Sequence, residues 1–174
     1  MRNIFIIGMM GSWKSTVGSE LAETLGMEFI DTDDAIEEVT EMKISDIFRE
    51  FGEDRFRDME TAFFIEKAKQ TGLVFSTGGG IVLGSENRKV LKKYGTTFLL
   101  NASTETLANR IHNTTKRPLL TDSKNIQFRL EQIWKERESY YKGSAHHIID
   151  TNNLSSAQVL DEILNILKVP FENH

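Results

Sequence analysis

Residues 8–16 read GMMGSWKST. They follow a short apolar run, Asn3–Ile7, that is typical of a buried strand, and they lead into a helical pattern from Lys14 to Leu25. A strand, a glycine-containing loop and a helix in this order form the context of the phosphate-binding pattern G-x-x-x-x-G-K-[ST]. The backbone N–H groups of such a loop and the start of the helix bind phosphate oxygens. The stretch therefore predicts a phosphate-binding loop after the first strand.

The loop departs from this pattern at Trp13, where the pattern has its second glycine. Glycine at such a position permits a positive φ angle and a close approach of the backbone to a ligand. If the loop needs a left-handed backbone here, a residue other than glycine costs about 1–2 kcal/mol. Alternatively, Trp13 is a hydrophobic residue in an ordinary strand-to-helix turn. The other positions of the pattern are intact and favour phosphate binding: Gly8, Gly11, Lys14, Ser15 and Thr16.

Strands and helices alternate along the rest of the chain. Further strands are expected at 28–30, 73–76, 97–100 and 147–149, and helices at 14–25, 34–51 (one or two), 54–70, 85–94, 103–111, 126–141 and 155–167. This alternation predicts an α/β fold with parallel strands and helices on both faces of the sheet. Ligands of such sheets bind at the carboxyl ends of the strands. Residues 8–16, 31–33 and 78–80 all follow predicted strands.

Asp31 and Asp33 flank Thr32 after the second predicted strand. If this stretch is extended, both carboxylates point to one face. One could then hold Mg²⁺ through water and the other could accept a proton from a substrate hydroxyl. The alternative is a pair of aspartates that cap the next helix.

Arginines on two predicted helices are candidate anion ligands. Arg57 and Glu60 share one helix face, so that Glu60 could orient the guanidinium toward a carboxylate. The alternative is a surface ion pair of little energetic value. Arg137 has the same two interpretations, as an anion ligand or as one charge on a solvated helix face.

Two further segments lie outside the predicted helices. The three glycines 78–80 would let backbone N–H groups approach a substrate closely, although a tight turn is the alternative. Residues 116–120 read KRPLL within a polar stretch and could form a flap that closes over phosphates, or a flexible surface loop with incidental charge.

Composition sets the broad class. The chain has 174 residues, about the length of one domain, and its net charge of −5 argues against a nucleic-acid binder. It contains no cysteine, which excludes disulfides and thiolate metal sites and is compatible with a reducing compartment. The longest apolar run is too short for a transmembrane helix. We expect a soluble, cytoplasmic protein without a membrane partner.

Together these segments resemble the shikimate kinase family, part of the nucleoside-monophosphate-kinase-like group of phosphate-loop proteins. The resemblance runs from Asn3 to about Leu167. It rests on residues 8–16, 29–33, Gly52-Glu53 with Phe56-Arg57 and Glu60, 76–80, 117–120, and Arg137 with Tyr140. It implies a single domain, 1–174, with a three-layer α/β/α fold, a five-stranded parallel sheet and a core at about 1–32, 73–111 and 143–174. It also implies a substrate-binding helical segment at about 33–60 and a lid at about 112–124.

The resemblance implies that the γ-phosphoryl group of ATP is transferred to the 3-hydroxyl of shikimate, with Mg²⁺ as the metal, by a monomer. The residues implied in ATP binding are Gly11, Ser12, Trp13, Lys14, Ser15, Thr16, Arg110 and Arg117. Those implied in shikimate binding are Asp33, Arg57, Gly78, Gly79, Gly80 and Arg137. Catalysis is implied for Lys14, Asp33 and Arg117, and Mg²⁺ binding for Ser15 and Asp31.

The family pattern has glycine at position 13, so Trp13 is expected to affect ATP binding and turnover rather than the fold or shikimate recognition. Two other functions remain open. One is a catalytically silent, shikimate-kinase-like ligand-binding protein, and the other is a kinase of another small hydroxy acid. The pair Arg57 and Arg137 favours an acidic substrate over a neutral sugar.

Overall fold

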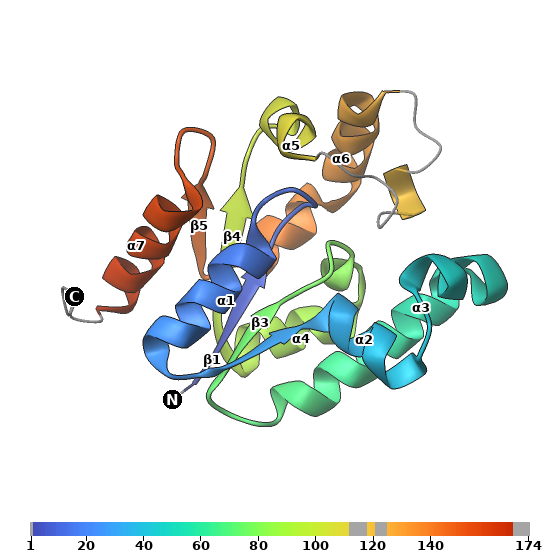
Figure 1. Cartoon of the computed structure of the whole chain (residues 1–174), viewed down its shortest axis with the longest axis horizontal. Helices are drawn as coiled ribbons and strands as arrows, with labels where there is room; N and C mark the ends of the chain where they lie inside the picture. The colour runs from blue at the N-terminus through green and yellow to red at the C-terminus, as the bar shows by residue number, and fades with distance from the viewer. Residues whose placement is uncertain (1, 112–117, 121–124, 169–174) are drawn as a thin grey trace.

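In a computed structural model, the chain forms one sheet with helices on both faces (Figure 1). The structure describes residues 2–111, 118–120 and 125–168. The strands are β1 (Asn3–Ile7), β2 (Glu28–Asp31), β3 (Leu73–Ser76), β4 (Gly95–Asn101) and β5 (His147–Asp150). They lie in the order β2-β3-β1-β4-β5, and every neighbouring pair is parallel. The predicted five-stranded parallel sheet is therefore confirmed.

The helices follow the predicted alternation, with one difference. They are α1 (Lys14–Leu25), α2 (Thr32–Thr40), α3 (Ile44–Ala68), α4 (Ser85–Lys93), α5 (Thr104–Arg110), α6 (Ile126–Ser144) and α7 (Ser156–Leu167), with short 3₁₀ turns η1 (Ile81–Leu83) and η2 (Pro118–Leu120). The difference is that α2 begins at Thr32 and not at residue 34. The predicted break near residue 52 is confirmed, because Gly52 has the non-helical angles φ 82° and ψ 168° and divides α3 into two helical segments that meet at a kink. Glycine tolerates this backbone conformation, so the chain can change direction there.

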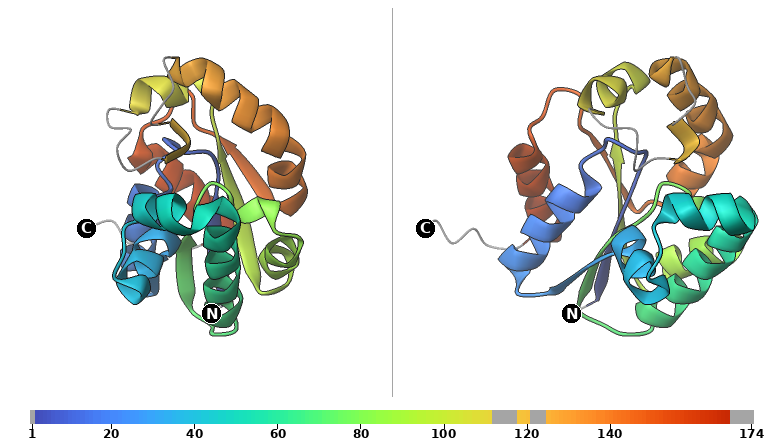
Figure 2. Two further views of the ribbon diagram at one scale, coloured as in Figure 1. Left: turned by 90° about the vertical axis from the view of Figure 1, so that its right-hand side faces the viewer. Right: turned by 45° about the vertical axis from the view of Figure 1, so that its right-hand side comes forward.

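The sheet separates two hydrophobic clusters, which makes the fold three-layered (Figure 2). All five residues of β1 are buried, and alternate side chains point to opposite faces. Phe5 packs with Phe64 of α3 and Phe75 of β3, next to α4 and α6. On the other face, α1 and α7 cover Ile4 and Ile6. Burial on both faces explains why the strands are short continuous apolar runs.

The carboxyl ends of β1, β2 and β3 meet at one edge of the sheet. Ser76, the last residue of β3, is in register with Ile6 of β1 and with Asp31 of β2. The loop after β1, the start of α2 and the glycines after β3 are therefore brought together, as the alternation of strands and helices predicted. No helix in the described part of the chain is long and apolar enough to cross a membrane.

Candidate active site

A cavity of about 630 Å³ opens at this edge of the sheet. Nearly all the residues that the sequence analysis singled out line it: Gly11, Trp13, Lys14, Ser15, Thr16, Asp31, Asp33, Arg57, Gly78, Gly79, Gly80, Arg110 and Arg137. Ser12 is an exception, because its side chain is buried and donates a hydrogen bond to the Met9 carbonyl at 2.7 Å. Arg117 and most of the predicted lid lie outside the described residues.

The loop after β1 presents the first turn of α1 to this cavity. The helix begins at Lys14, and no side chain caps its N-terminus. Uncapped N–H groups and the helix dipole favour an anion at this place. The Lys14 ammonium reaches back and donates to the Met9 carbonyl at 2.9 Å, within the same loop. The loop therefore has the backbone donors and the cation that the phosphate-binding pattern requires.

Trp13 adopts the left-handed conformation, with φ 67° and ψ 20°. The position thus has the backbone geometry that glycine adopts without strain. The indole packs against the hydrophobic cluster under α1 and α7. The guanidinium carbon of Arg110 lies 3.5 Å from the centroid of the indole ring, a cation–π stack that offsets part of the strain.

Arg110 is fixed by more than this stack. It donates hydrogen bonds to the hydroxyl and the carbonyl of Thr151, at 3.0 and 2.6 Å. Trp13 and Arg110 also line a second cavity, of about 580 Å³, together with residues of α5 and of the loop before α7. The stacked pair is therefore a wall shared by two neighbouring cavities.

Ser15, Asp31 and Ser76 form a cluster of oxygen atoms in the main cavity. The Ser15 hydroxyl lies 2.5 Å from Asp31 Oδ2 and 3.1 Å from the Ser76 hydroxyl. Asp31 Oδ1 accepts from the backbone N–H groups of Asp33 and Asp34, so Asp31 also caps α2. The capping interpretation is thus right for Asp31, whose other oxygen stays directed at Ser15.

This donor set fits Mg²⁺, which prefers oxygen ligands and keeps several waters. No group of three or more His, Cys, Asp or Glu side chains in the described part of the chain is arranged to hold a metal ion. Ser15 and Asp31 would therefore hold Mg²⁺ together with water and phosphate oxygens, rather than in a closed cage of protein ligands.

Asp33 lies in the first turn of α2, not in an extended stretch. The extended geometry that would direct both carboxylates to one face is therefore absent, because β2 ends at Asp31 and α2 begins at Thr32; both aspartates nevertheless line the cavity. Asp33 Oδ1 is buried and accepts no hydrogen bond from the residues that the structure describes. Burial raises the pKa of Asp33 to about 7, and the charges of Glu60 and Asp31 add to the rise, while Lys14 and Arg57 oppose it.

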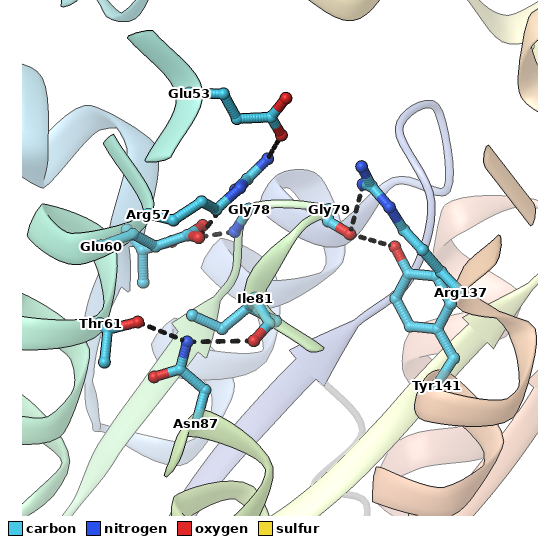
Figure 3. Close-up of polar contacts among 11 residues, drawn as sticks. Glu53, Arg57, Glu60, Thr61, Gly78, Gly79, Ile81, Asn87, Arg137 and Tyr141 are labelled. Carbon is cyan, nitrogen blue, oxygen red and sulfur yellow. Dashed lines mark hydrogen bonds and ion pairs between the residues drawn. The ribbon is translucent and has the colours of Figure 1, made fainter. Parts of the chain in front are cut away.

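Arg57 is held by two carboxylates of α3 (Figure 3). It donates to Glu60 Oε2 at 2.8 Å and to Glu53 Oε1 at 3.1 Å. The Glu60 side chain is fully buried, so the predicted pairing is confirmed and the surface-pair interpretation is wrong. Burial raises the pKa of Glu60, although Arg57 and Arg137 oppose the shift. Glu53 and Glu60 therefore hold the Arg57 guanidinium in one orientation within the cavity.

The missing side chains of the three glycines 78–80 leave space for different neighbouring groups. A Cβ atom at Gly78 would lie 2.5 Å from Glu60 Oε1 and 2.6 Å from Asp33 Oδ1, and one at Gly80 would collide with the Arg57 guanidinium. At Gly79, by contrast, the nearest atom would be Tyr141 Oη at 3.6 Å, an ordinary contact. A side chain at Gly78 or Gly80 would therefore displace charged groups of the protein. At Gly79 the absence of a side chain instead leaves free space in the cavity.

Sequence reasoning missed Tyr141. The resemblance named Tyr140, but that residue is 40% exposed and its ring lies against Arg88. Tyr141 is fully buried and donates a hydrogen bond to the Gly79 carbonyl, as Arg137 does at 3.1 Å (Figure 3). The signal was present, because Tyr141 lies four residues after Arg137 and continues the helix face of Leu130 and Ile133.

The chain is similar to known proteins of one family. A family model described as shikimate kinase matches residues 10–168. The shikimate kinase of Thermodesulfovibrio yellowstonii is 42% identical over 164 residues, 94% of each chain. That of Sulfurihydrogenibium sp. is 40% identical over 97% of this chain and 99% of its own. The solved shikimate kinase of Acinetobacter baumannii, in complex with shikimate, is 36% identical with a TM-score of 0.92, covering 97% of this chain and 93% of its own. The chain belongs to the shikimate kinase family of phosphotransferases.

Proposed function

We propose that this chain transfers the γ-phosphoryl group of ATP to the 3-hydroxyl group of shikimate, giving shikimate 3-phosphate and ADP. One observation carries the proposal: a single cavity is lined by the phosphate-binding loop, by the buried Arg137 and largely buried Arg57, and by Asp33, whose pKa is raised. The similar Acinetobacter baumannii enzyme was solved in complex with shikimate, which supports the choice of substrate.

The acid-binding end is built from Arg57 and Arg137. Both are largely buried, and two guanidinium groups can hold one carboxylate through paired, charge-assisted hydrogen bonds. Glu53 and Glu60 fix the direction of Arg57 before the substrate arrives, which lowers the entropy lost on binding. This end therefore selects a small acid.

Asp33 takes the proton. Its pKa of about 7 lies near neutral pH, where a general base is most effective, and its unpartnered Oδ1 can accept a hydroxyl proton. The substrate oxygen attacks the γ-phosphorus, the bond from that phosphorus to the bridging oxygen breaks, and ADP leaves with the bonding electrons. The hydroxyl proton passes to Asp33.

The phosphate end supplies positioning and positive charge, which dominate catalysis of phosphoryl transfer. The loop donates backbone N–H groups from residues 11–16, and Lys14 neutralises phosphate charge. Ser15 and Asp31 would hold Mg²⁺, which would supply further positive charge to the phosphate groups when bound. Arg110 lies beside the nucleoside. Arg117 and the lid at 112–124 lie almost wholly outside the described residues, and their roles rest on the family resemblance alone.

The substrate-binding segment at 33–60 corresponds to α2 and most of α3, which carry Asp33 and Arg57. The cysteine-free sequence favours a reducing compartment, and we propose that the chain acts in the cytoplasm as a monomer.

The test is ADP release with ATP, Mg²⁺ and shikimate, on this chain and on Trp13→Gly. Shikimate-dependent release by this chain supports the proposal. Release only by Trp13→Gly makes Trp13 a local block of the phosphate loop. Shikimate binding by calorimetry with no release from either chain indicates a silent ligand-binding protein. A panel of other hydroxy acids, run alongside, identifies a different substrate if shikimate gives no release.

A further inference from the structure

The Gly79 carbonyl is held by two donors from one helix. The Arg137 guanidinium donates to it at 3.1 Å, and the Tyr141 hydroxyl donates to it from beneath (Figure 3). The Tyr141 ring is fully buried and stacks on Trp134, with centroids 5.8 Å apart and an interplanar angle of 17°. A ring held in this way cannot turn its hydroxyl aside. The carbonyl is therefore fixed in direction by α6.

This contact also sets the direction of the next amide. The peptide bond between Gly79 and Gly80 is trans, like all others in the described residues. In a trans peptide the C=O and the following N–H point in opposite directions. With the carbonyl held toward α6, the Gly80 N–H is turned away from that helix.

Two donors of the glycine turn have no partner in the described part of the chain: the N–H groups of Gly79 and Gly80. Their neighbours do, since Gly78 N–H donates to the Thr32 hydroxyl at 2.9 Å and Ile81 N–H to the Gly78 carbonyl at 3.1 Å. Gly79 and Gly80 both line the cavity. Two backbone donors are therefore available to a ligand at this place.

The free space at Gly79 fits the same interpretation. A Cβ atom there would meet only ordinary contacts: 3.6 Å to Tyr141 Oη, 3.7 Å to the Gly8 carbonyl and 3.8 Å to Met10 N. The fold does not exclude a side chain at this position. The absent side chain instead lets a ligand oxygen approach the backbone, between the acid-binding arginines and the phosphate loop.

We propose that Tyr141 is a positioning residue for substrate binding. Together with Arg137, its hydroxyl fixes the Gly79–Gly80 peptide so that the free amide donors bind oxygen atoms of the hydroxy-acid substrate. Arg137 donates to this carbonyl through Nη1, and its remaining guanidinium N–H groups can bind the substrate carboxylate. The identity of the substrate rests on the proposed function, whereas the effect of Tyr141 on the peptide does not.

The test removes one hydroxyl and nothing else. Tyr141→Phe keeps the buried ring and its stack on Trp134, and Tyr140→Phe is the matched control on the exposed side of α6. We expect Tyr141→Phe to weaken shikimate binding about 3- to 10-fold by calorimetry, the range for loss of one buried hydrogen bond. The KM for shikimate should rise by a similar factor while the KM for ATP stays the same, and Tyr140→Phe should leave both unchanged.

A second measurement does not depend on substrate. ¹⁵N relaxation of the Gly79 and Gly80 amides reports the motion of this peptide, and we expect it to increase in Tyr141→Phe only. Unchanged shikimate affinity together with unchanged relaxation overturns the proposal. Equal rises in both KM values with a lower melting temperature also overturn it, because they indicate general structural support. If the unmodified chain binds no shikimate, the proposed function fails, and relaxation alone then decides whether Tyr141 positions the peptide.

Discussion

The two ends of the cavity bind anions by different means. At the acid-binding end the charges are on side chains and are buried: 20% of the Arg57 side chain is exposed, none of Glu60 and 3% of Arg137. At the phosphate end the donors are mostly backbone N–H groups at the start of α1. A side-chain site depends on which residue is present, whereas a backbone site depends on φ and ψ.

This difference explains how Trp13 can stand in the phosphate loop. The backbone there needs a left-handed residue, and Trp13 adopts that conformation at φ 67°, with its ring stacked on Arg110. Another residue cannot replace Arg57 in this way. Its guanidinium donates to Glu53 and Glu60 and fits into the space left by the missing side chain of Gly80. We therefore expect substitutions to cost more at the acid-binding end, and the predictions below test this order.

The largest effect is expected for Arg57→Ala. The variant removes one of the two arginines that hold the substrate carboxylate and takes from the buried Glu60 its ion-pair partner at 2.8 Å, a loss that typically costs about 3–5 kcal/mol. Shikimate affinity should fall at least about 100-fold, and the melting temperature should fall as well. Calorimetry and thermal unfolding measure the two effects. Arg55→Ala, an exposed position on α3, should change neither; an equal loss there contradicts the assignment.

Asp33→Asn should lower turnover about 100-fold or more, the usual contribution of a general base, while ATP affinity changes little. Steady-state kinetics and nucleotide titration separate the two quantities. Asp54→Asn, on the exposed side of α3, is the control. Full activity of Asp33→Asn would exclude Asp33 as the base.

The same variant makes a prediction about pH and stability. The raised pKa of Asp33 means that the folded protein favours the neutral carboxyl, so stability falls as pH rises from about 4 through about 7. Asparagine cannot ionise, so Asp33→Asn should be more stable than the unmodified chain at pH 8, and this advantage should disappear near pH 4. Chemical denaturation at both pH values measures it, and an advantage independent of pH contradicts the raised pKa.

Gly78→Ala and Gly79→Ala should separate the needs of the fold from those of the ligand. A methyl group at Gly78 meets Glu60 and Asp33, and overpacking of this kind costs roughly 1–3 kcal/mol of stability. Gly79→Ala should fold as stably as the unmodified chain but bind shikimate about tenfold more weakly, since its methyl group occupies ligand space. Loss of stability in Gly79→Ala would show that the position serves packing.

The smallest effect is expected for the difference in stability between Trp13→Ala and Trp13→Gly. Both variants lose the indole, but only glycine relieves the left-handed strain. Trp13→Ala should therefore be less stable by about 1 kcal/mol, or roughly 2–4 °C in melting temperature for a chain of this size. Thermal unfolding of the two variants measures the strain directly, and identical melting temperatures would mean that position 13 relaxes.

Local patterns in the sequence predicted much of this protein. The periods of apolar residues predicted five strands and the bounds of α1. The order of strand, loop and lysine predicted the phosphate loop. These features depend on residues close together in the chain, so their spacing is enough to show them.

Other features arise only when distant segments pack together. Glu60 of α3 is buried, and Asp33 lies in the first turn of α2. Tyr141 of α6 contacts Gly79, which follows β3. The stack of Trp13 on Arg110 joins α1 to α5. Helical spacing places Tyr141, not Tyr140, on the buried face of α6, but it does not show that the hydroxyl reaches the Gly79 carbonyl, because that contact depends on how α6 packs against the turn after β3. The sequence by itself therefore determines which chemical groups are available to this cavity. Their positions relative to one another are determined by the packing of helices and loops around the sheet.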